Sequence, residues 1–400
     1  MSSGWIDVQL SDVATIQSGS GFPEKFQGES DQAIPFFKVS DMNIAGNERE
    51  MIYANNTVSE TVRAQLGASI FPAGNTIFPK IGGAIATNKK RLTTQNSCVD
   101  NNVMGAIPRR DKVRSDFLFY FFLSHDLSEF ANEAHLPSIK KTVVESWPIK
   151  VPVHLAEQQR IVRILDEAFE GIAAAKTNAE KNLENARALL ESHLQAVFTQ
   201  RGRGWQEKRL KEVCEKITDG THQTPTYFDE GITFLSSRNV TSGSIDWERI
   251  KYIDTKQHLA MHKRVAPRIN DILLAKNGTT GVAAIVDRDV SFDIYVSLAL
   301  LRSLSVLRPK FLLFFINSPI AKQQFNKRLK GVGVPNLHLE EIREVVLSFP
   351  ASLTEQDRVL DSLESLQAET QHLESLYQQK LTALDALKKS LLHQAFSGAL

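Results

Sequence analysis

Short motifs that mark several classes of enzyme are missing from this sequence of 400 residues. It has no G-x-x-x-x-G-K-[S/T] loop for nucleotide phosphates, and its ten histidines show no H-E-x-x-H spacing. None of its 14 prolines is followed by another proline, so the Asn/Asp-Pro-Pro-aromatic tetrapeptide that adenine methylation requires is absent. The sequence therefore argues against ATP hydrolysis and methyl transfer by this chain alone, and we expect no metal site in it.

Cysteines are few and long apolar runs are lacking. The two cysteines, Cys98 and Cys214, fit neither a disulfide framework nor a repeated metal site. The longest apolar runs, Phe117–Leu123 and Phe311–Ile316, are far shorter than the roughly 20 residues that span a bilayer. The N-terminus also lacks the basic and apolar segments of a secretory signal. We expect a cytoplasmic protein without membrane contact, in which both runs form buried helices.

What the sequence does contain is a duplication with a spacing of about 200 residues. Gly4-Trp5 returns as Gly204-Trp205, and Leu155–Asp166 returns as Leu353–Glu364. Leu194–Phe198 likewise returns as Leu392–Phe396. This period is much longer than the 20 to 50 residues or so of solenoid repeats. It predicts a pair of duplicated domains.

Each repeat begins with short strand-like runs and ends in a long helical segment. The runs are separated by Gly, Asn and Pro, which is typical of an α+β domain. They are Ile34–Val39, Thr76–Pro79, Val103–Ile107 and Trp147–Val151 in the first repeat, and Ile232–Leu235, Asp271–Ala275, Gly281–Val286 and Val345–Phe349 in the second. The expected fold is α+β, with globular domains at 1–152 and 202–350 and long helices at 153–201 and 351–400.

The two helical segments carry apolar residues at alternating spacings of three and four, which indicates a coiled coil. Since an isolated amphipathic helix would leave its apolar stripe in water, each helix needs a partner. Antiparallel pairing of the two helices would give one chain pseudo-twofold symmetry; packing of each helix only on its own domain is the alternative. The expected seam contains Val162, Leu165, Phe169, Ile172, Leu183, Leu190 and Val197 in the first helix, and Leu363, Leu366, Leu373, Tyr377, Leu384, Leu387 and Leu391 in the second.

Positive charge is concentrated in the second globular domain, although the whole chain carries only +1. Residues 201–350 contain 23 Lys and Arg against 16 Asp and Glu, whereas residues 1–150 contain 15 against 16. A basic domain favours a polyanionic partner such as nucleic acid.

Three segments carry a resemblance to a known family. VPVHLAEQQRIVRILDEAF and FPASLTEQDRVLDSLESL each join a Pro-containing strand to a Glu-Gln pair and a long helix, and GVGVPNLHLEEIREVVLSFP precedes the second of them. In their order and duplication these segments resemble the specificity subunit of a type I restriction-modification system. The resemblance spans essentially the whole chain. In one respect the repeats differ, because the first has Ala134–Ile139 where the second has the glycine-rich Gly331–Leu337.

The resemblance implies a chain that binds double-stranded DNA and performs no catalysis. Each globular domain would be a target recognition domain for one half of a bipartite, asymmetric sequence, and the helices would set the spacer between the halves. The family further implies two methyltransferase subunits, which use S-adenosylmethionine, and two motor-nuclease subunits, which use ATP and Mg²⁺. No cofactor is expected in this chain itself.

Candidate DNA-binding residues are polar or basic side chains on predicted loops, where they can reach phosphates and base edges. Arg238 and Asn239 are the preferred base readers, since arginine can bind guanine and asparagine adenine with two hydrogen bonds; the alternative is that Asn239 caps a turn and Arg238 pairs with a carboxylate. The full set is Ser20, Lys38, Ser40, Lys80, Gly82, Lys89, Lys90, Arg91 and Lys140 in the first domain, and Thr221, His222, Arg238, Asn239, Lys276, Asn277, Thr279, Lys330, Gly331, Gly333 and Asn336 in the second.

Two other classes of function remain open on the sequence alone. One is a coiled-coil scaffold with two protein-binding domains and no DNA contact, which salt-dependent DNA binding would eliminate. The other is an autonomous nucleic-acid enzyme, which the missing motifs make the least favoured of the three.

Overall fold

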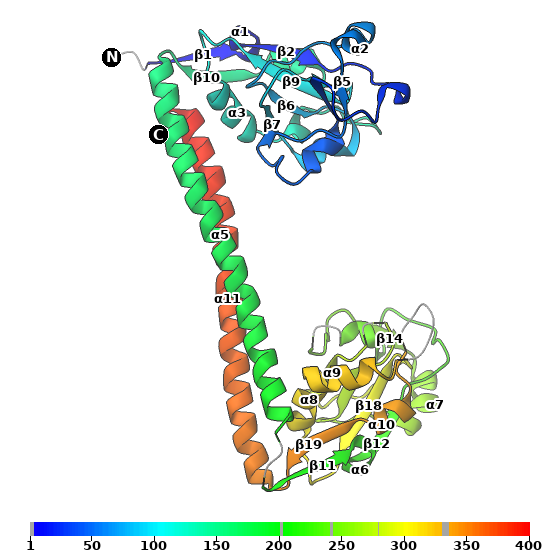
Figure 1. The fold of residues 1–400 in the computed structure, drawn as a ribbon. Helices are drawn as coiled ribbons and strands as arrows, with labels where there is room; N and C mark the ends of the chain where they lie inside the picture. The colour runs from blue at the N-terminus through cyan, green and yellow to red at the C-terminus, as the bar shows by residue number, and fades with distance from the viewer. Residues whose placement is uncertain (1–3, 201–202, 241–242, 279, 330–335) are drawn as a thin grey trace. The chain divides into compact units, whose positions relative to one another are not determined.

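The computed structural model describes residues 4–200, 203–240, 243–278, 280–329 and 336–400 (Figure 1). Its contacts divide the chain into two compact units. The first unit contains Met1–Ala179 and Gln379–Leu400, and the second contains Glu180–Gln378. Within the described residues, no helix offers the stretch of apolar side chains that is needed to cross a bilayer.

Strands of the first unit are β1 (Trp5–Gln9), β2 (Ala14–Ser18), β3 (Ile34–Phe37), β4 (Glu50–Met51), β5 (Thr57–Val58), β6 (Thr76–Pro79), β7 (Arg91–Thr93), β8 (Cys98–Val99), β9 (Val103–Pro108) and β10 (Pro148–Pro152). Strand β1 pairs antiparallel with β10. A five-stranded sheet has the order β2-β9-β6-β7-β4, and a three-stranded sheet has the order β5-β3-β8, in which β3 and β8 are parallel. The helices are α1 (Leu10–Val13), α2 (Glu60–Gln65), α3 (Ser115–Leu123) and α4 (Lys141–Glu145), with 3-10 turns η1 (Glu24–Phe26), η2 (Val39–Asn43), η3 (Gly82–Thr87) and η4 (Leu127–Phe130).

The second unit repeats this arrangement with β11 (Trp205–Arg209), β12 (Cys214–Asp219), β13 (Ile232–Leu235), β14 (Lys251–Ile253), β15 (Ile272–Ala275), β16 (Ala283–Ile285), β17 (Phe292–Ile294), β18 (Leu298–Ser303) and β19 (Val346–Pro350). Strand β11 pairs with β19, and the larger sheets have the orders β12-β18-β15-β16 and β14-β13-β17. The helices are α6 (Leu210–Val213), α7 (Thr255–Val265), α8 (Pro309–Asn317), α9 (Pro319–Asn326) and α10 (Leu339–Arg343), and η5 (Ser237–Asn239) is a 3-10 turn. The α+β fold and the internal repeat are confirmed.

The sequence repeats mark equivalent strand pairs. Trp5 lies opposite Pro152 in the β1–β10 pair, and Trp205 lies opposite Pro350 in the β11–β19 pair. The two apolar runs form α3 and α8. All residues from Phe117 to Phe122 are buried in α3, and Phe311, Leu312, Phe314, Phe315 and Ile316 are buried in α8. Both runs are therefore core helices, as expected.

Two long helices, α5 (Leu155–Phe198) and α11 (Leu353–Ser397), contribute to both units. In the first unit, Leu165 of α5 and Leu392 of α11 share one core cluster, and Lys176 lies 2.8 Å from Asp385. In the second unit, Arg187 lies 3.1 Å from Glu374, and Leu194 shares a core cluster with Leu363. As residue numbers rise along α5 they fall along α11, so the helices pair antiparallel within each unit (Figure 1).

The side chains of the expected seam are buried or partly buried, with one exception. Leu387 is 46% exposed, and the neighbouring Lys388 instead lies over the ring of Phe169, with its Nζ 4.8 Å from the ring centroid. The long lysine stem covers an apolar ring at a position where the spacing alone favours leucine. Of the other seam residues, Val162, Leu165, Ile172, Val197 and Leu363 are buried, and Phe169, Leu183, Leu190, Leu366, Leu373, Tyr377, Leu384 and Leu391 are partly buried.

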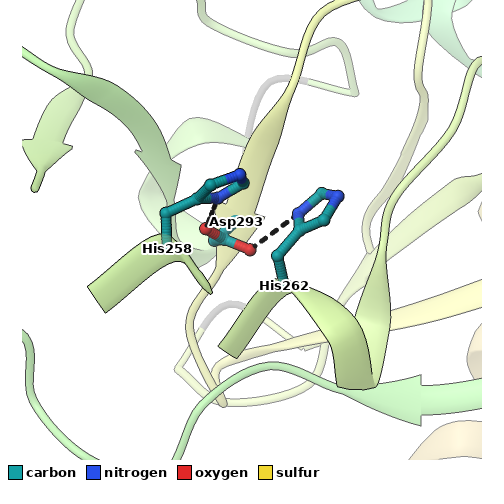
Figure 2. Close-up of side chains that lie close together, drawn as sticks. All are labelled: His258, His262 and Asp293. Atoms are coloured by element: carbon teal, nitrogen blue, oxygen red, sulfur yellow. Dashed lines mark hydrogen bonds and ion pairs between the residues drawn. The ribbon is translucent and has the colours of Figure 1, made fainter. Parts of the chain in front are cut away.

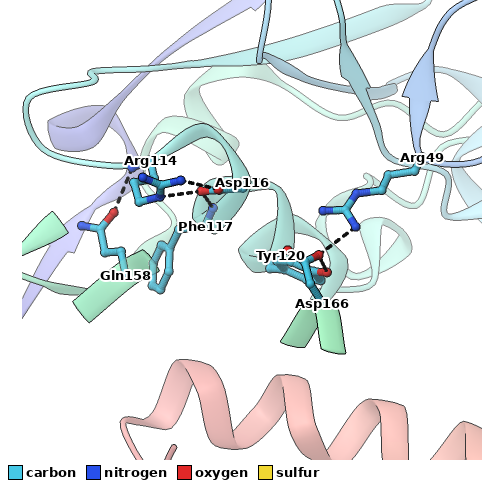
Figure 3. Close-up of polar contacts among 7 residues, drawn as sticks. All are labelled: Arg49, Arg114, Asp116, Phe117, Tyr120, Gln158 and Asp166. Carbon is cyan, nitrogen blue, oxygen red and sulfur yellow. Dashed lines mark hydrogen bonds and ion pairs between the residues drawn. The ribbon is translucent and has the colours of Figure 1, made fainter. Parts of the chain in front are cut away.

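A glutamine in the first turn of each long helix ties the helix to its globular domain. Gln158 and Gln356 come from the repeated Glu-Gln pair, and both are fully buried. The Gln158 side-chain oxygen accepts a hydrogen bond from the backbone N–H of Arg114 over 2.8 Å (Figure 3). Its side-chain amide donates to the carbonyls of Lys112 and Pro152. Gln356 makes the equivalent three bonds with Arg308, Val306 and Pro350, at 2.9 Å each. The Glu-Gln pair in the sequence thus marks the residue that fixes each long helix to its globular domain.

A second contact in the first unit joins α3 to α5. The Tyr120 hydroxyl donates to an Asp166 carboxylate oxygen over 2.5 Å, and the Arg49 guanidinium lies 2.8 Å from the same oxygen (Figure 3). Burial and the neighbouring carboxylate both raise the pKa of Tyr120. The phenol therefore remains a donor, which holds the long helix against α3.

Replacement of Gln356 by leucine should lower the free energy of unfolding by about 3 to 5 kcal/mol. The change keeps the side-chain size but leaves one buried N–H and two buried carbonyls without their partner, at a cost of about 1 to 3 kcal/mol per group. Urea unfolding measures the loss. Gln371→Leu, an exposed position of the same helix, is the matched control. Indistinguishable urea midpoints for the two variants would show that the buried bonds contribute nothing.

Candidate nucleic-acid interface

One polar site occurs at the same place in both units. Lys80 follows β6 and Lys276 follows β15, which are equivalent strands. The carbonyl of Lys80 accepts a hydrogen bond from the N–H of Ile139 (2.9 Å), and that of Lys276 accepts one from Leu337 (2.9 Å). The segments around 139 and 337 are therefore equivalent in space, as the comparison of Ala134–Ile139 with Gly331–Leu337 predicts.

A glycine brings a second loop into each of these sites. A Cβ on Gly19 would lie 2.0 Å from the carbonyl oxygen of Asp100, and one on Gly220 would lie 1.9 Å from that of Ile294. Only glycine permits so close an approach of two backbones. The next residues, Ser20 and Thr221, consequently bridge to the ends of β8 and β17.

The charge around the two lysines differs between the units. The Lys80 ammonium donates to the Ser18 hydroxyl (3.1 Å), and burial lowers the pKa of Lys80 although Asp100 acts in the opposite direction. Lys276 lies 3.3 Å from one carboxylate oxygen of Asp219, and the other oxygen accepts from Arg264 over 2.5 Å. The second site thus holds its lysine in an ion pair, whereas Lys80 contacts a neutral partner.

The Lys276 site opens into a pocket of about 910 Å³. It contains the candidates His222, Lys276, Asn277 and Asn336, and it is also lined by Asp219, Val296, Leu339, Glu340, Arg264, His338 and Arg343. His222 lies 3.3 Å from Asp219, with an exposed side chain. Four candidates from distant parts of the sequence therefore meet at one opening.

A second pocket of the same unit, about 630 Å³, surrounds Arg238 at the end of β13. Its lining combines cations, aromatic rings and hydroxyls: Tyr227, Phe234, Ser236, Ser237, Arg238, Asn239, Asp246, Arg249, Lys251, Tyr295 and Ser297. The Lys251 ammonium lies 3.9 Å from the centroid of the Tyr227 ring, and the Arg249 side chain is 91% exposed. Such a set of groups can donate to phosphates and base edges and can stack on bases.

The two preferred base readers lie in different surroundings. Asn239 is buried: its side-chain oxygen accepts from the N–H of Ser236 (2.9 Å), and its amide donates to the carbonyls of Asp246 and Arg249. These bonds match the turn-capping alternative for Asn239. Arg238 is exposed at the same pocket.

Several basic candidates of the first unit are held by protein groups. Lys38 donates to Gln27, Lys89 to Asn43, and Arg91 to the carbonyl of Met42. Lys90 is 2% exposed and donates to the carbonyl of His125 (2.7 Å), and burial lowers the pKa of Lys90 to about 8. A lysine with so little exposed surface is poorly placed to contact a phosphate.

Some of the remaining candidates belong to the residues that the structure describes, and others do not. Gly82 has φ +70° and donates its N–H to the carbonyl of Pro137. Ser40 and Lys140 are exposed. Thr279, Lys330, Gly331 and Gly333 lie outside the described residues.

Sequence reasoning did not select Tyr227, Arg249, Lys251 or Tyr295. The usable signal was the pair of basic residues Arg249 and Lys251 between the aromatic residues Trp247 and Tyr252, since nucleic-acid sites combine positive charge with aromatic rings. The pocket itself could not be foreseen, because Tyr227 and Tyr295 come from segments far from this stretch.

A model of the type I restriction-modification DNA specificity domain matches the chain twice, at residues 2–185 and 202–383. These two matches cover most of the chain, and each includes the equivalent lysine site. The chain therefore belongs to the family of type I restriction-modification DNA specificity proteins.

Individual relatives agree with this assignment. The chain is 21% identical to the EcoBI specificity subunit of Escherichia coli, over 99% of the chain and 86% of the relative. It is 22% identical to the MjaIX specificity subunit of Methanocaldococcus jannaschii, over 86% and 83%.

Solved structures show the same fold. A chain from a structure concerning complex assembly and conformational transition of the type I R-M system matches with a TM-score of 0.79 and 18% identity, covering 99% of this chain and 98% of that chain. The HsdS subunit from Thermoanaerobacter tengcongensis matches with a TM-score of 0.62 and 19% identity, covering 100% and 98%.

Proposed function

We propose that this chain is the DNA-reading subunit of a type I restriction-modification complex, in which each globular domain reads one half of a bipartite, asymmetric target. The observation that carries the proposal is the twofold match to the DNA specificity domain, together with the lysine site that recurs in both units. Two separate reading domains in one chain suit a target of two different half-sites, because the loops of the two domains differ in sequence. The domain boundaries proposed for this division are 1–152 and 202–350.

In the second domain, the Arg238 pocket is the proposed site of base reading. Arg238 and Arg249 supply planar guanidinium groups, which can bind the O6 and N7 atoms of guanine together. Tyr227 and Tyr295 supply rings, and Ser236 and Ser237 supply short donors and acceptors. Asn239 shapes the turn that presents Arg238, through its bonds to Ser236 and Asp246.

The Lys80 and Lys276 sites are the proposed contacts to the DNA backbone. Each lies where two loops meet beside a glycine, so that main-chain N–H groups as well as side chains can approach phosphate oxygens. Asp219 is shared by Lys276 and Arg264, and the lining of the second site holds the three cations Lys276, Arg264 and Arg343 against the two carboxylates of Asp219 and Glu340, so the site keeps a net positive charge.

The long helices are proposed to set the spacer between the half-sites and to dock two methyltransferase subunits. Methylation of an adenine in each half-site would then use S-adenosylmethionine bound to those subunits. Two motor-nuclease subunits would add cleavage driven by ATP with Mg²⁺. This division of labour agrees with the missing catalytic motifs and with a cytoplasmic location, both inferred from the sequence.

Arg249→Ala should weaken binding of the assembled complex to its target about tenfold. The exposed guanidinium is removed from the proposed reading pocket, and a good base contact contributes about 1 to 3 kcal/mol. Binding to a labelled target duplex at fixed salt measures the effect, and methylated-adenine mapping in cells supplies the target sequence.

Arg209→Ala is the matched control, because Arg209 is also an exposed arginine beside a carboxylate, 3.0 Å from Glu344, and does not line the pocket. It should leave affinity unchanged. Equal affinity of the Arg249→Ala complex and the unaltered complex would remove this pocket from the interface.

A further inference from the structure

Two histidines and one aspartate lie close together in the second unit (Figure 2). None of the three lines either pocket described above. His258 and His262 are one helical turn apart on α7, and Asp293 is the central residue of β17. The Nδ1 atom of His258 lies 2.7 Å from one oxygen of Asp293, and that of His262 lies 3.0 Å from the other. One potential ligand atom from each side chain lies within 4.8 Å of the others.

Asp293 differs from the other buried aspartates of this unit. Asp271 is paired with Arg302 at 2.7 Å, and Asp219 is paired with Arg264 at 2.5 Å. Asp293 is 2% exposed, yet within the described residues neither of its carboxylate oxygens contacts a lysine, an arginine or a backbone N–H. A buried carboxylate is costly unless it is paired, and the partners of Asp293 among the described residues are two imidazoles, so a bound cation would stabilise this position.

The fold itself does not require an acid at this position. Asp293 lies opposite Phe234 in the parallel pair of β13 and β17, and Cys98 lies opposite Phe36 in the equivalent pair of β3 and β8. The first unit thus builds the same strand with a small apolar residue. The two histidines and the aspartate are therefore an addition that is specific to the second unit.

We propose that His258, His262 and Asp293 form a binding site for one divalent transition-metal ion of the Zn²⁺ type. Imidazole nitrogen and carboxylate oxygen are ligands that Zn²⁺ accepts, and three protein ligands with a water molecule complete a tetrahedron. The ion would place a full positive charge beside the buried carboxylate of Asp293. The sequence predicted no metal site, because the third ligand lies 31 residues beyond His262.

The three ligand atoms must rearrange locally to hold the ion. Tetrahedral Zn²⁺ with bonds of about 2.0 to 2.2 Å places its ligand atoms roughly 3.4 Å apart. The hydrogen-bonded distances of 2.7 and 3.0 Å must therefore lengthen as each imidazole exchanges its Nδ1 proton for the metal. The two imidazole ligand atoms, which lie within 4.8 Å of each other, must reach the same spacing. The ion can enter from solvent, because the side chains of His258 and His262 are 14% and 28% exposed.

A metal at this site would fasten α7 to β17. Asp293 belongs to the strand that leads directly to Tyr295, and Tyr295 lines the Arg238 pocket. The ion is thus placed to stiffen one wall of that pocket without contacting its occupant. This is a structural site and involves no chemical step.

The cysteines of the chain are weak competitors for the ion. Burial raises the pKa of Cys98 to about 11 and that of Cys214 to about 12, so both thiols stay protonated, whereas Zn²⁺ binds the thiolate. Zinc uptake by the full chain can therefore be tested through its histidines.

The test measures Zn²⁺ binding to the full-length chain by competition with a chromophoric chelator, with the bound metal counted by mass spectrometry after dialysis. We expect one Zn²⁺ per chain and at least tenfold weaker binding in His262→Gln and in Asp293→Asn, since even partners outside the ligand shell contribute about 10- to 100-fold to affinity. Zn²⁺ at 100 times its Kd should also raise the melting temperature by roughly 5 °C, in the unaltered chain only.

His372→Gln is the matched control, because His372 is an exposed histidine of α11 outside the site. It should bind Zn²⁺ as the unaltered chain does. If Asp293→Asn fails to fold, His258→Gln and His262→Gln decide the result, since both histidines are partly exposed. Uptake that is absent at micromolar Zn²⁺, or that is equal in the control and in the histidine variants, would overturn the proposal.

Discussion

Exchange of residues 202–350 for the matching segment of a relative with another specificity should change one half of the methylated DNA target and leave the other half unaltered. The segment includes both strands of the β11–β19 pair and both larger sheets of the second unit, so its sheet hydrogen bonds are internal. The first half-site should persist because the first domain keeps its own loops. Sequencing of methylated adenines in cells that carry the hybrid measures both halves at once.

The design of this hybrid depends on Gln356, which lies outside the exchanged segment. Its side chain binds backbone groups of Val306, Arg308 and Pro350, which lie inside the segment. A suitable donor therefore has a loop of equal length between β18 and α8. The reciprocal exchange of residues 1–152 is the control and should change the opposite half of the target. A hybrid whose two halves change together would contradict independent reading by the two domains.

Introduction of two aspartates at the helix seam, Leu363→Asp with Leu366→Asp, should abolish assembly with the partner subunits. Leu363 is fully buried in the core of the second unit, and Leu366 is partly buried. Loss of the leucine and burial of an unpaired charge together should cost at least about 4 kcal/mol. That is a large share of the roughly 5 to 15 kcal/mol that stabilises a typical domain. Size-exclusion chromatography and thermal unfolding measure the outcome.

The matched control for the seam is Ser362→Asp with Ser365→Asp. Both serines belong to the same helical turns and are exposed, so this variant introduces the same charge without burying it. It should assemble and unfold as the unaltered chain does. Intact assembly of the Leu363→Asp, Leu366→Asp variant would mean that the pairing of α5 with α11 does not support the complex.

Much of the architecture could be predicted from local patterns. The strand-like runs at 76–79 and 232–235 match β6 and β13 in full, and the run at 103–107 ends one residue before β9 does. The helix seam was predictable because the spacing of apolar residues along one helix is a local property. Leu387 was the exception. It is exposed, because Lys388 rather than Leu387 lies over the ring of Phe169 on the other long helix, and the spacing along one helix does not show this.

Fewer features of the candidate site could be predicted from the sequence. A cluster of basic residues such as Lys89, Lys90 and Arg91 predicts a solvent-exposed surface. Lys90 is nevertheless buried and donates to the carbonyl of His125. Tyr227, Arg249 and Tyr295 become a pocket lining only after β13, β14 and β17 have paired. Which basic residues face solvent depends on contacts between distant segments.

The sequence by itself determined that this protein is a duplicated pair of α+β domains with two long helices, and that it resembles a DNA specificity subunit. Repeats, apolar spacing and short motifs carry that information because each lies within a continuous stretch of chain. Only the tertiary structure decided that Asn239 shapes a turn, that Gln158 and Gln356 join helix to domain, and that His258 and His262 meet Asp293. Burial and the proximity of charged groups arise from packing between distant segments, which no local pattern contains.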